Sequence, residues 1–101
     1  MSKPRDVKDM MVVLSKHKQE LLDQYHVQKI GIFGSFARNE AIPVSDVDIL
    51  VELNQAVGWE IVDLHQYLEQ ITGMKVDLIT EGALAKRPLL RRSIEEDLVY
   101  A

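Results

Sequence analysis

The chain has 101 residues, 47% of them hydrophobic and 28% charged, so it is long enough to bury one core and is expected to form a single domain over residues 1–101. Its net charge of −4 argues against binding of nucleic acid by bulk electrostatics, and the lack of cysteine excludes disulfides and thiolate metal sites. No apolar stretch approaches the length of a membrane span and the N-terminus has no signal-peptide pattern, so a cytoplasmic location is expected by default.

The first part of the chain is predicted to hold a long helix, a strand and a short turn. Apolar residues at roughly helical spacing predict an amphipathic helix over about Asp6–Tyr25, with Met10 in the core. The segment Val27–Phe33 alternates well enough to predict a buried strand, which Gly34 ends. Residues 35–40 are predicted to form a helical turn with Ser35 as its N-cap, followed by a loop over residues 41–45.

The second part is predicted to alternate strands and helices. Strands are expected over residues 46–53 and 75–80, on either side of a helix that runs from Trp59 to Ile71. Trp59 is expected to pack at the start of that helix, and Gly73 suits its C-terminal end. Residues 81–101 are predicted to hold one or two helical pieces, with Pro88 at a helix start. This order predicts a two-layer or three-layer α/β domain around a small sheet.

Two aspartates interrupt the apolar strand predicted over residues 46–53. Residues two apart on a strand point to the same face, so Asp46 and Asp48 are expected to stand side by side while Val47 points the other way. Two ionised carboxylates this close repel each other unless a cation lies between them. Because all the ligands are oxygens, a hard cation is favoured, either Mg²⁺ or Mn²⁺.

A third aspartate, Asp77, interrupts the strand predicted over residues 75–80. If the two strands are neighbours, Asp77 reaches the same face and completes a cup of three carboxylates. Such a cup can hold two metal ions about 3.5–4 Å apart, the arrangement used for in-line attack at phosphorus. Glu52, four residues after Asp48, would fall on the same face, and two interpretations of it stay open, an additional ligand and a surface residue.

The Gly34–Ser35 turn ahead of these strands is a candidate phosphate site. Gly34 has no side chain, so a phosphate can approach the backbone closely. Ser35 offers a hydroxyl group, and the N–H groups that open the following helical turn point to the same place. One turn later, Arg38 is either a phosphate ligand with forked donors or a solvated helix arginine, and the sequence leaves both interpretations open.

The segment GIFGSFARNEAIPVSDVDILVEL (residues 31–53), together with KVDLIT (residues 75–80), resembles the signature of the polymerase-beta-like nucleotidyltransferases. Nearly the full chain is most similar to the minimal nucleotidyltransferase (MNT) proteins, which pair with HEPN-domain toxins. The resemblance implies a nucleotidyltransferase fold, a small mixed sheet flanked by helices. Asn39 stands where family members usually have Gly, and Asn is the next-best residue for a left-handed turn.

The resemblance also implies a reaction, the transfer of a nucleoside monophosphate with pyrophosphate as the leaving group. Asp46, Asp48 and Asp77 would then be catalytic and bind two Mg²⁺ ions, while Gly34 and Ser35 hold the phosphates of a nucleoside triphosphate. ATP would be the donor and a tyrosine hydroxyl of a HEPN-domain toxin the acceptor. The chain would thus be an antitoxin that acts by AMP transfer.

Two other functions remain open at this point. The chain could transfer a nucleotide to a small molecule such as an aminoglycoside, or to an RNA end. It could also be an antitoxin that masks its partner without chemistry. The apolar and basic segment Leu84–Leu98 is a candidate docking surface, although its acidic residues also fit a mixed-charge, solvated helix.

Overall fold

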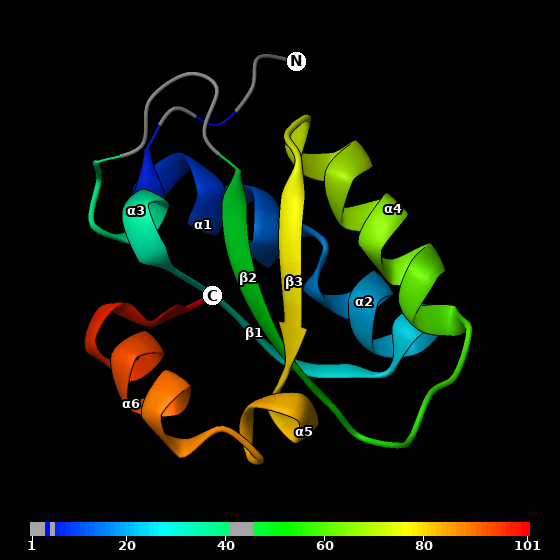
Figure 1. The fold of residues 1–101 in the computed structure, drawn as a ribbon. Helices are drawn as coiled ribbons and strands as arrows, with labels where there is room; N and C mark the ends of the chain where they lie inside the picture. The colour runs from blue at the N-terminus through cyan, green and yellow to red at the C-terminus, as the bar shows by residue number, and fades with distance from the viewer. Residues whose placement is uncertain (1–3, 5, 41–45) are drawn as a thin grey trace.

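The computed structural model describes Pro4, residues 6–40 and residues 46–101, and shows a mixed sheet with helices on both faces (Figure 1). The elements follow in the order α1 (Val7–Lys16), α2 (Lys18–Tyr25), β1 (Val27–Phe33), α3 (Gly34–Ala37), β2 (Val47–Leu53), α4 (Glu60–Thr72), β3 (Val76–Thr80), α5 (Glu81–Leu84), α6 (Pro88–Asp97) and β4 (Val99–Tyr100). The predicted fold class, a small mixed sheet flanked by helices, is confirmed. The loop expected over residues 41–45 lies outside the described residues. None of the described helices is both long and apolar enough to cross a membrane.

The sheet has the strand order β3-β2-β1-β4. Strands β2 and β3 run parallel, while β1 runs antiparallel to both β2 and β4. The register pairs Asp48 with Asp77 on one side and with Phe33 on the other. Because Phe33 directly precedes Gly34, this register brings the turn and two of the aspartates to the same end of the sheet.

Alternation along β2 points Asp48 and Leu50 to one face of the sheet and their apolar neighbours to the other. Val47, Ile49 and Val51 are fully buried in the main core, which α1, α2 and α4 cover. Met10 is fully buried in this core, as predicted. Asp48 lies on the opposite face, so the main core packs behind the strand and does not bury this carboxyl group.

A second, smaller core lies on the face of β2 that carries Asp48. It is built from Leu50 of β2, Leu84 of α5 and Ile94 of α6, all almost completely buried. These three side chains hold the C-terminal helices against the sheet. The C-terminal part of the chain therefore forms one wall beside the acidic residues.

The long helix predicted over Asp6–Tyr25 is wrong in one respect, since the chain forms two helices that meet at His17. At His17 the backbone leaves helical geometry (φ −105°, ψ 6°), and its Nδ1 lies 2.8 Å from the carbonyl oxygen of Val13. A side chain that bonds to the backbone in this way competes with the regular helix ladder. The start of the first helix is capped by Asp6, whose carboxylate accepts the Asp9 N–H at 2.9 Å.

Two further differences concern aromatic residues. Trp59 does not pack at the start of α4, because 88% of its surface is exposed and the helix begins at Glu60. Tyr100 belongs to the short edge strand β4, which was not predicted. The end of α4 agrees with the sequence, because Gly73 takes the left-handed C-cap conformation (φ 68°).

Candidate active site

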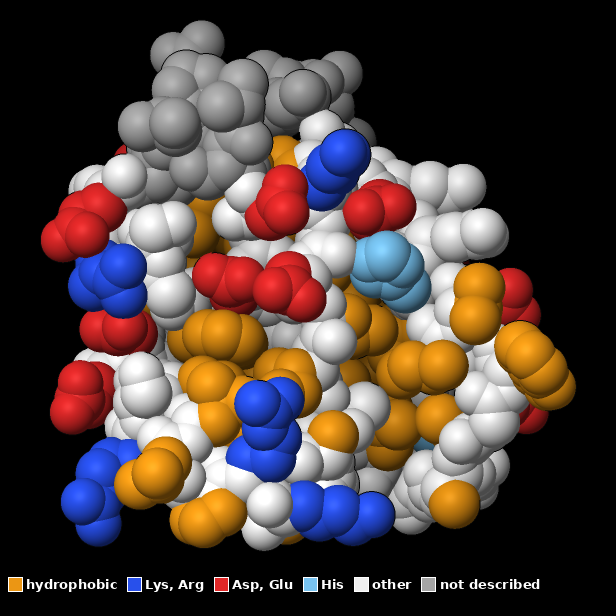
Figure 2. Space-filling view, viewed as in Figure 1, with side chains coloured by type: hydrophobic (Ala, Val, Ile, Leu, Met, Phe, Trp, Pro, Cys, Tyr) orange, Lys and Arg blue, Asp and Glu red, His pale blue; other side chains and the backbone are white. Residues whose placement is uncertain are grey.

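Asp48 and Asp77 lie side by side on neighbouring parallel strands. Each is the second residue of its strand, and the register of β2 and β3 pairs them directly. Asp48 is partly buried and Asp77 is exposed. Figure 2 shows acidic side chains gathered over β2 and β3, above a band of hydrophobic side chains. The two carboxylates therefore stand at the surface of the sheet, open to a ligand from this face.

The carboxyl group of Asp48 is hard to ionise in this environment. Partial burial, the negative charge of Asp77 and a side-chain hydrogen bond with Asp77 raise its pKa to about 6. The charge of Asp46 raises the pKa further, and the Arg38 guanidinium opposes the shift. In the absence of a cation, the protonated form of Asp48 therefore persists to a higher pH than that of an ordinary aspartic acid.

Asp46 precedes β2 and is exposed, and it acts on Asp48 through its charge. Among the described residues, no three or more His, Cys, Asp or Glu side chains converge closely enough to hold a metal ion. The structure therefore brings Asp48 and Asp77 together as a pair with Asp46 nearby. It does not show the complete three-carboxylate cup that the sequence predicts.

Gly34 lies against the Asp48 carboxylate and cannot be replaced by another residue without strain. Its backbone is left-handed (φ +73°), and a Cβ built on it would collide with the Oδ2 oxygen of Asp48. Both the conformation and the close approach require glycine. The Gly34–Ser35 turn and Asp48 thus form one continuous surface.

Ser35 lies inside the first turn of α3 and is partly buried. The prediction that Ser35 is the N-cap is wrong, because the helix begins at Gly34 and its N-cap is Phe33, in extended conformation (φ −145°, ψ −176°). The turn closes with the Asn39 N–H donating to the Phe36 carbonyl at 3.0 Å. Asn39 itself is left-handed (φ 62°), as expected of a residue that replaces glycine.

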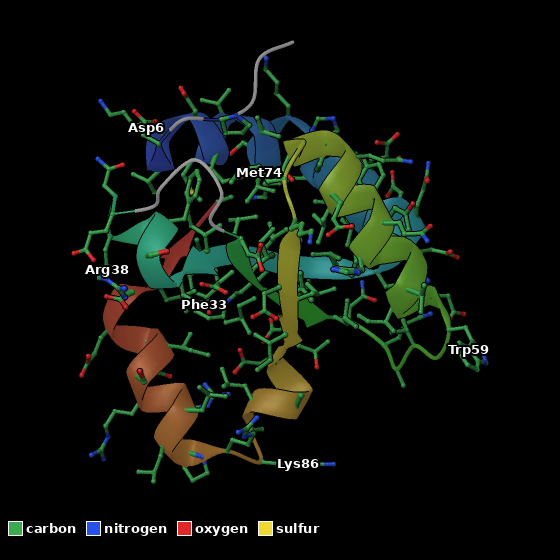
Figure 3. The ribbon with its side chains drawn as sticks, turned by 45° about the horizontal axis from the view of Figure 1, so that its top comes forward. Asp6, Phe33, Arg38, Trp59, Met74 and Lys86 are labelled. Carbon is green, nitrogen blue, oxygen red and sulfur yellow. The ribbon has the colours of Figure 1, made fainter. Side chains whose placement is uncertain are left out.

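Arg38 is exposed and lies where α3 meets the C-terminal end of α6 (Figure 3). Its Nη1 donates to Oδ2 of Asp97 at 2.6 Å, and its Nε donates to Oε2 of Glu40 at 3.1 Å. These hydrogen bonds, Glu40 first, raise the pKa of Arg38 above its usual value. Arg38 is therefore a tethered arginine whose charge also reaches Asp48, and its role as a phosphate ligand stays a prediction.

Several residues that support the site were not identified from the sequence. Asp97 is one, and the run of acidic residues at the end of a predicted helix is the signal that could have found it. Glu69 and His65 of α4 are two more, because the Glu69 carboxylate accepts the Val76 N–H at 3.0 Å and His65 Nε2 lies 2.6 Å from the Val76 carbonyl oxygen. Their spacing of four residues on one helix face was the available signal. They fix the strand residue next to Asp77.

Glu52 does not join the aspartates. It is partly buried near the far end of β2 and lines a hollow together with Thr80, Glu81 and residues 53–57. It lies four positions after Asp48 along the strand, which corresponds to about 13 Å. It is therefore a residue of a different part of this face.

The arrangement joins groups with two complementary capacities. A pair of carboxylates, one of them reluctant to ionise alone, can bind a hard cation. The backbone of a glycine turn pressed against one of these carboxylates can receive an anion next to that cation. A metal-bound polyphosphate is a ligand that meets both requirements.

Comparison with known proteins agrees with this chemistry. The family model described as "Nucleotidyltransferase domain" matches residues 14–101. A Methanocaldococcus jannaschii protein named as a candidate protein adenylyltransferase, MJ0128, is 43% identical over 97 residues, which cover 95% of this chain and 98% of the relative. Protein adenylyltransferase MntA of Thermococcus cleftensis is 36% identical over 89 residues, which cover 87% of this chain and 88% of the relative.

Solved structures share the fold. A chain described as a candidate minimal nucleotidyltransferase superposes with a TM-score of 0.76 and 26% identity, covering 93% of this chain and 94% of the other. A structure of a tri-AMPylated Shewanella oneidensis HEPN toxin in complex with MNT antitoxin gives a TM-score of 0.61 at 21% identity, covering 88% of this chain and 68% of the other. From the family match over residues 14–101 and the close relatives along almost the whole chain, we conclude that this chain belongs to the nucleotidyltransferase domain family and is a nucleotidyltransferase.

Proposed function

We propose that the chain is a Mg²⁺-dependent protein adenylyltransferase that transfers AMP from ATP to a tyrosine of a HEPN-domain toxin, and thereby acts as the antitoxin. In this proposal, residues 1–101 form one minimal nucleotidyltransferase domain. The observation that carries it is the direct pairing of Asp48 with Asp77 on parallel strands, with the Gly34 turn against Asp48. The relatives named as protein adenylyltransferases support the choice of AMP and of a protein acceptor.

The donor set fits Mg²⁺, with Mn²⁺ as an alternative. Asp46, Asp48 and Asp77 offer only carboxylate oxygens, which hard cations prefer. The raised pKa of Asp48 supports the fit, because a bound cation would offset the negative charge of Asp77, which disfavours the ionised form of Asp48. When bound, two such ions supply charge stabilisation at the transferring phosphorus and at the leaving group.

The Gly34–Ser35 turn is the proposed site for the phosphates of ATP. Gly34 leaves the backbone open next to Asp48, and Ser35 contributes a hydroxyl group from the same turn. Arg38, at the end of α3, adds a guanidinium whose charge already reaches Asp48. These groups hold the phosphate chain so that the α-phosphorus faces the acidic side chains.

The reaction is an in-line displacement at the α-phosphorus of ATP. The acceptor oxygen forms a bond to this phosphorus while the bond to the oxygen that bridges to the β-phosphate breaks, and pyrophosphate leaves. The hydroxyl proton passes to solvent or to a nearby carboxylate. The protein contributes by holding the two oxygens in line, because positioning and charge account for most catalysis of this kind.

A HEPN-domain protein is the proposed acceptor. This chain shares its fold with a chain from the complex of a tri-AMPylated HEPN toxin with an MNT antitoxin. Its sequence also resembles the MNT proteins. A tyrosine hydroxyl is a suitable nucleophile, because it can reach a shallow site from a docked partner. The exposed position of Asp77 agrees with a site that is open to a macromolecule.

A labelling experiment tests this proposal. The chain is incubated with Mg²⁺ and ATP labelled in the α-phosphate, together with the HEPN-domain protein encoded beside it, free tyrosine, aminoglycosides or short RNAs. We expect label on the HEPN protein alone, and loss of label after substitution of its acceptor tyrosine by phenylalanine. Label on a small molecule or RNA, with none on the HEPN protein, would replace this proposal by the corresponding alternative.

A further inference from the structure

We propose that Asp97, the last residue of α6, is a positioning residue for the nucleotide site. It acts through Arg38, which it holds in an ion pair, and so fixes the turn that carries Gly34 and Ser35. This inference rests on the proposed function, since it assumes that the turn receives the phosphates of ATP. It assigns a role to a residue that lies outside the sequence motif.

The contacts of Arg38 define how Asp97 acts. Asp97 accepts a hydrogen bond from Nη1 at 2.6 Å and Glu40 accepts one from Nε at 3.1 Å, so two carboxylates fix the guanidinium plane. The Nη2 nitrogen forms no hydrogen bond to another residue in the described part of the chain. The guanidinium group is thus oriented through Nε and Nη1, and the N–H donors of Nη2 stay available to an anion.

The position of Asp97 needs an explanation, because it opposes the helix dipole. The last turn of α6 carries Glu95, Glu96 and Asp97 and no basic residue. Acidic side chains at a helix C-terminus are unfavourable by about 0.3–1 kcal/mol each in exposed positions. Arg91 compensates Glu95 from within the helix, whereas Asp97 is compensated from α3 by Arg38.

Helix α6 is firmly attached to the sheet, so it is a suitable anchor. Ile94 is 4% exposed and packs with Leu50 and Leu84, and Arg91 is bonded to Glu81 of α5. Asp97 follows Ile94 by less than one turn, so its backbone has a fixed position relative to Leu50 of β2. Asp48 of β2 and Asp97 therefore share one rigid frame.

Helix α3 depends on such an anchor. It has four residues, too few to be stable alone, and its buried contact is Phe36. The Arg38 N–H donates to the Gly34 carbonyl at 3.1 Å, so the two ends of the turn are directly linked. Holding Arg38 to Asp97 consequently holds Gly34 against Asp48.

The test measures binding of α,β-methylene ATP, in which the bond that would break cannot be cleaved, by calorimetry in the presence of Mg²⁺. The test variant is Asp97→Asn. The matched control is Glu96→Gln, which removes the same charge from the same helix end at an exposed neighbour. Asp97→Glu tests rescue by the conservative variant, and Asp97→Asn in an Arg38→Gln background tests whether the effect passes through Arg38.

We expect Asp97→Asn to weaken binding of the analogue on the order of 3- to 10-fold, because the substitution removes the ion pair between Asp97 and Arg38. Glu96→Gln should bind like the wild type and Asp97→Glu should recover most of the affinity. With Arg38→Gln present, Asp97→Asn should have no further effect. In the transfer reaction, KM for ATP should rise while kcat changes less than about twofold.

Two kinds of failure can be told apart. Suppose that the wild type binds the analogue. The positioning role of Asp97 is then wrong, while the proposed function stands, if Asp97→Asn binds the analogue as tightly as the wild type or more tightly. The same holds if Asp97→Asn weakens binding by the same factor in the Arg38→Gln background as in the wild type. If the wild type does not bind the analogue at all, the proposed function is wrong and this inference falls with it. A melting temperature of Asp97→Asn close to that of Glu96→Gln verifies that folding is retained.

Discussion

At the scale of single residues, the site is defined by one carboxyl group, that of Asp48. It is enclosed by its strand neighbour Asp77 and by the backbone of Gly34. Both neighbours remove water from it, and neither offers a positive charge. The free energy of this group therefore depends strongly on whether a proton or a cation is present.

The first prediction concerns the pH dependence of stability without divalent metal. The pKa of Asp48 rises from 3.8 to about 6 on folding, so the folded state favours the protonated form. The resulting stabilisation is complete below about pH 4 and is lost as the pH rises to about 6. We expect Asp48→Asn, which mimics the neutral form, to be more stable than the wild type above about pH 6, by on the order of 1 kcal/mol because solvent screens a partly exposed group.

Urea denaturation in EDTA across this pH range measures the effect. The difference in unfolding free energy between Asp48→Asn and the wild type should shrink towards pH 4 and level off above about pH 6. A constant difference at all pH values would show that Asp48 does not titrate as its surroundings require.

The second prediction concerns Gly34. Gly34→Ala adds a Cβ that collides with the Asp48 carboxylate in a left-handed conformation, so we expect a loss of about 1–3 kcal/mol in unfolding free energy. Gly82→Ala is the control, because a Cβ at Gly82 meets no atom within 4 Å and the residue lies in the helix α5. It should be neutral or stabilising, by up to about 1 kcal/mol. Equal stability of the two variants in chemical denaturation would contradict the close packing of Gly34 on Asp48.

At the scale of elements, the C-terminal helices form one wall of the candidate site, and α6 links the sheet to the turn at Arg38. Helix α6 contributes one nearly buried apolar residue, Ile94, to the smaller core. We expect Ile94→Ala to lower the unfolding free energy by about 2–4 kcal/mol and to weaken nucleotide binding, because α6 also carries Asp97. Leu89→Ala on the same helix is the control, since Leu89 is 81% exposed and its removal should change stability by less than about 0.5 kcal/mol. Similar melting temperatures for both variants would show that α6 is not held by this core.

The elements also show how far the sequence could predict this structure. Strands β1, β2 and β3 were predicted to within one residue, because buried apolar runs bounded by glycine or a helix leave few alternatives. Val47 and Asp48 were assigned to the correct faces by alternation alone. The pairing of Asp48 with Asp77 was expected only if their strands were neighbours, a condition that a single sequence cannot test.

What could not be predicted depends on contacts between distant residues or on local competition. At the break between α1 and α2, His17 Nδ1 lies 2.8 Å from the Val13 carbonyl oxygen, a contact that helical periodicity does not reveal. The pairing of Arg38 with Asp97 joins residues 59 apart in the chain. Strand β4 has two exposed residues, too few for an alternating pattern. The roles that the sequence assigns toward a ligand stay predictions for all six site residues: Gly34, Ser35, Arg38, Asp46, Asp48 and Asp77.

At the scale of the whole molecule, a site built from unneutralised carboxylates should respond to its ligands. A ligand that binds only the folded state raises its stability, by about 2.7 kcal/mol at one hundred times the dissociation constant. We expect millimolar Mg²⁺ to raise the melting temperature of the wild type, and more so with α,β-methylene ATP. Asp48→Asn should lose the response to Mg²⁺, and an unchanged response in that variant would remove Asp48 from the metal site.

The central claim is that Asp48 and Asp77 carry out AMP transfer to a HEPN-domain partner. The most direct measurement is the intact mass of that partner after incubation with the chain, Mg²⁺ and ATP, compared among the wild type, Asp48→Asn and Asp77→Asn. We expect a gain of one or more AMP units with the wild type and none with either variant, although both variants still form the complex in gel filtration. An unmodified partner that the wild type nevertheless neutralises, or a partner modified equally by the variants, would show that Asp48 and Asp77 do not carry out this transfer.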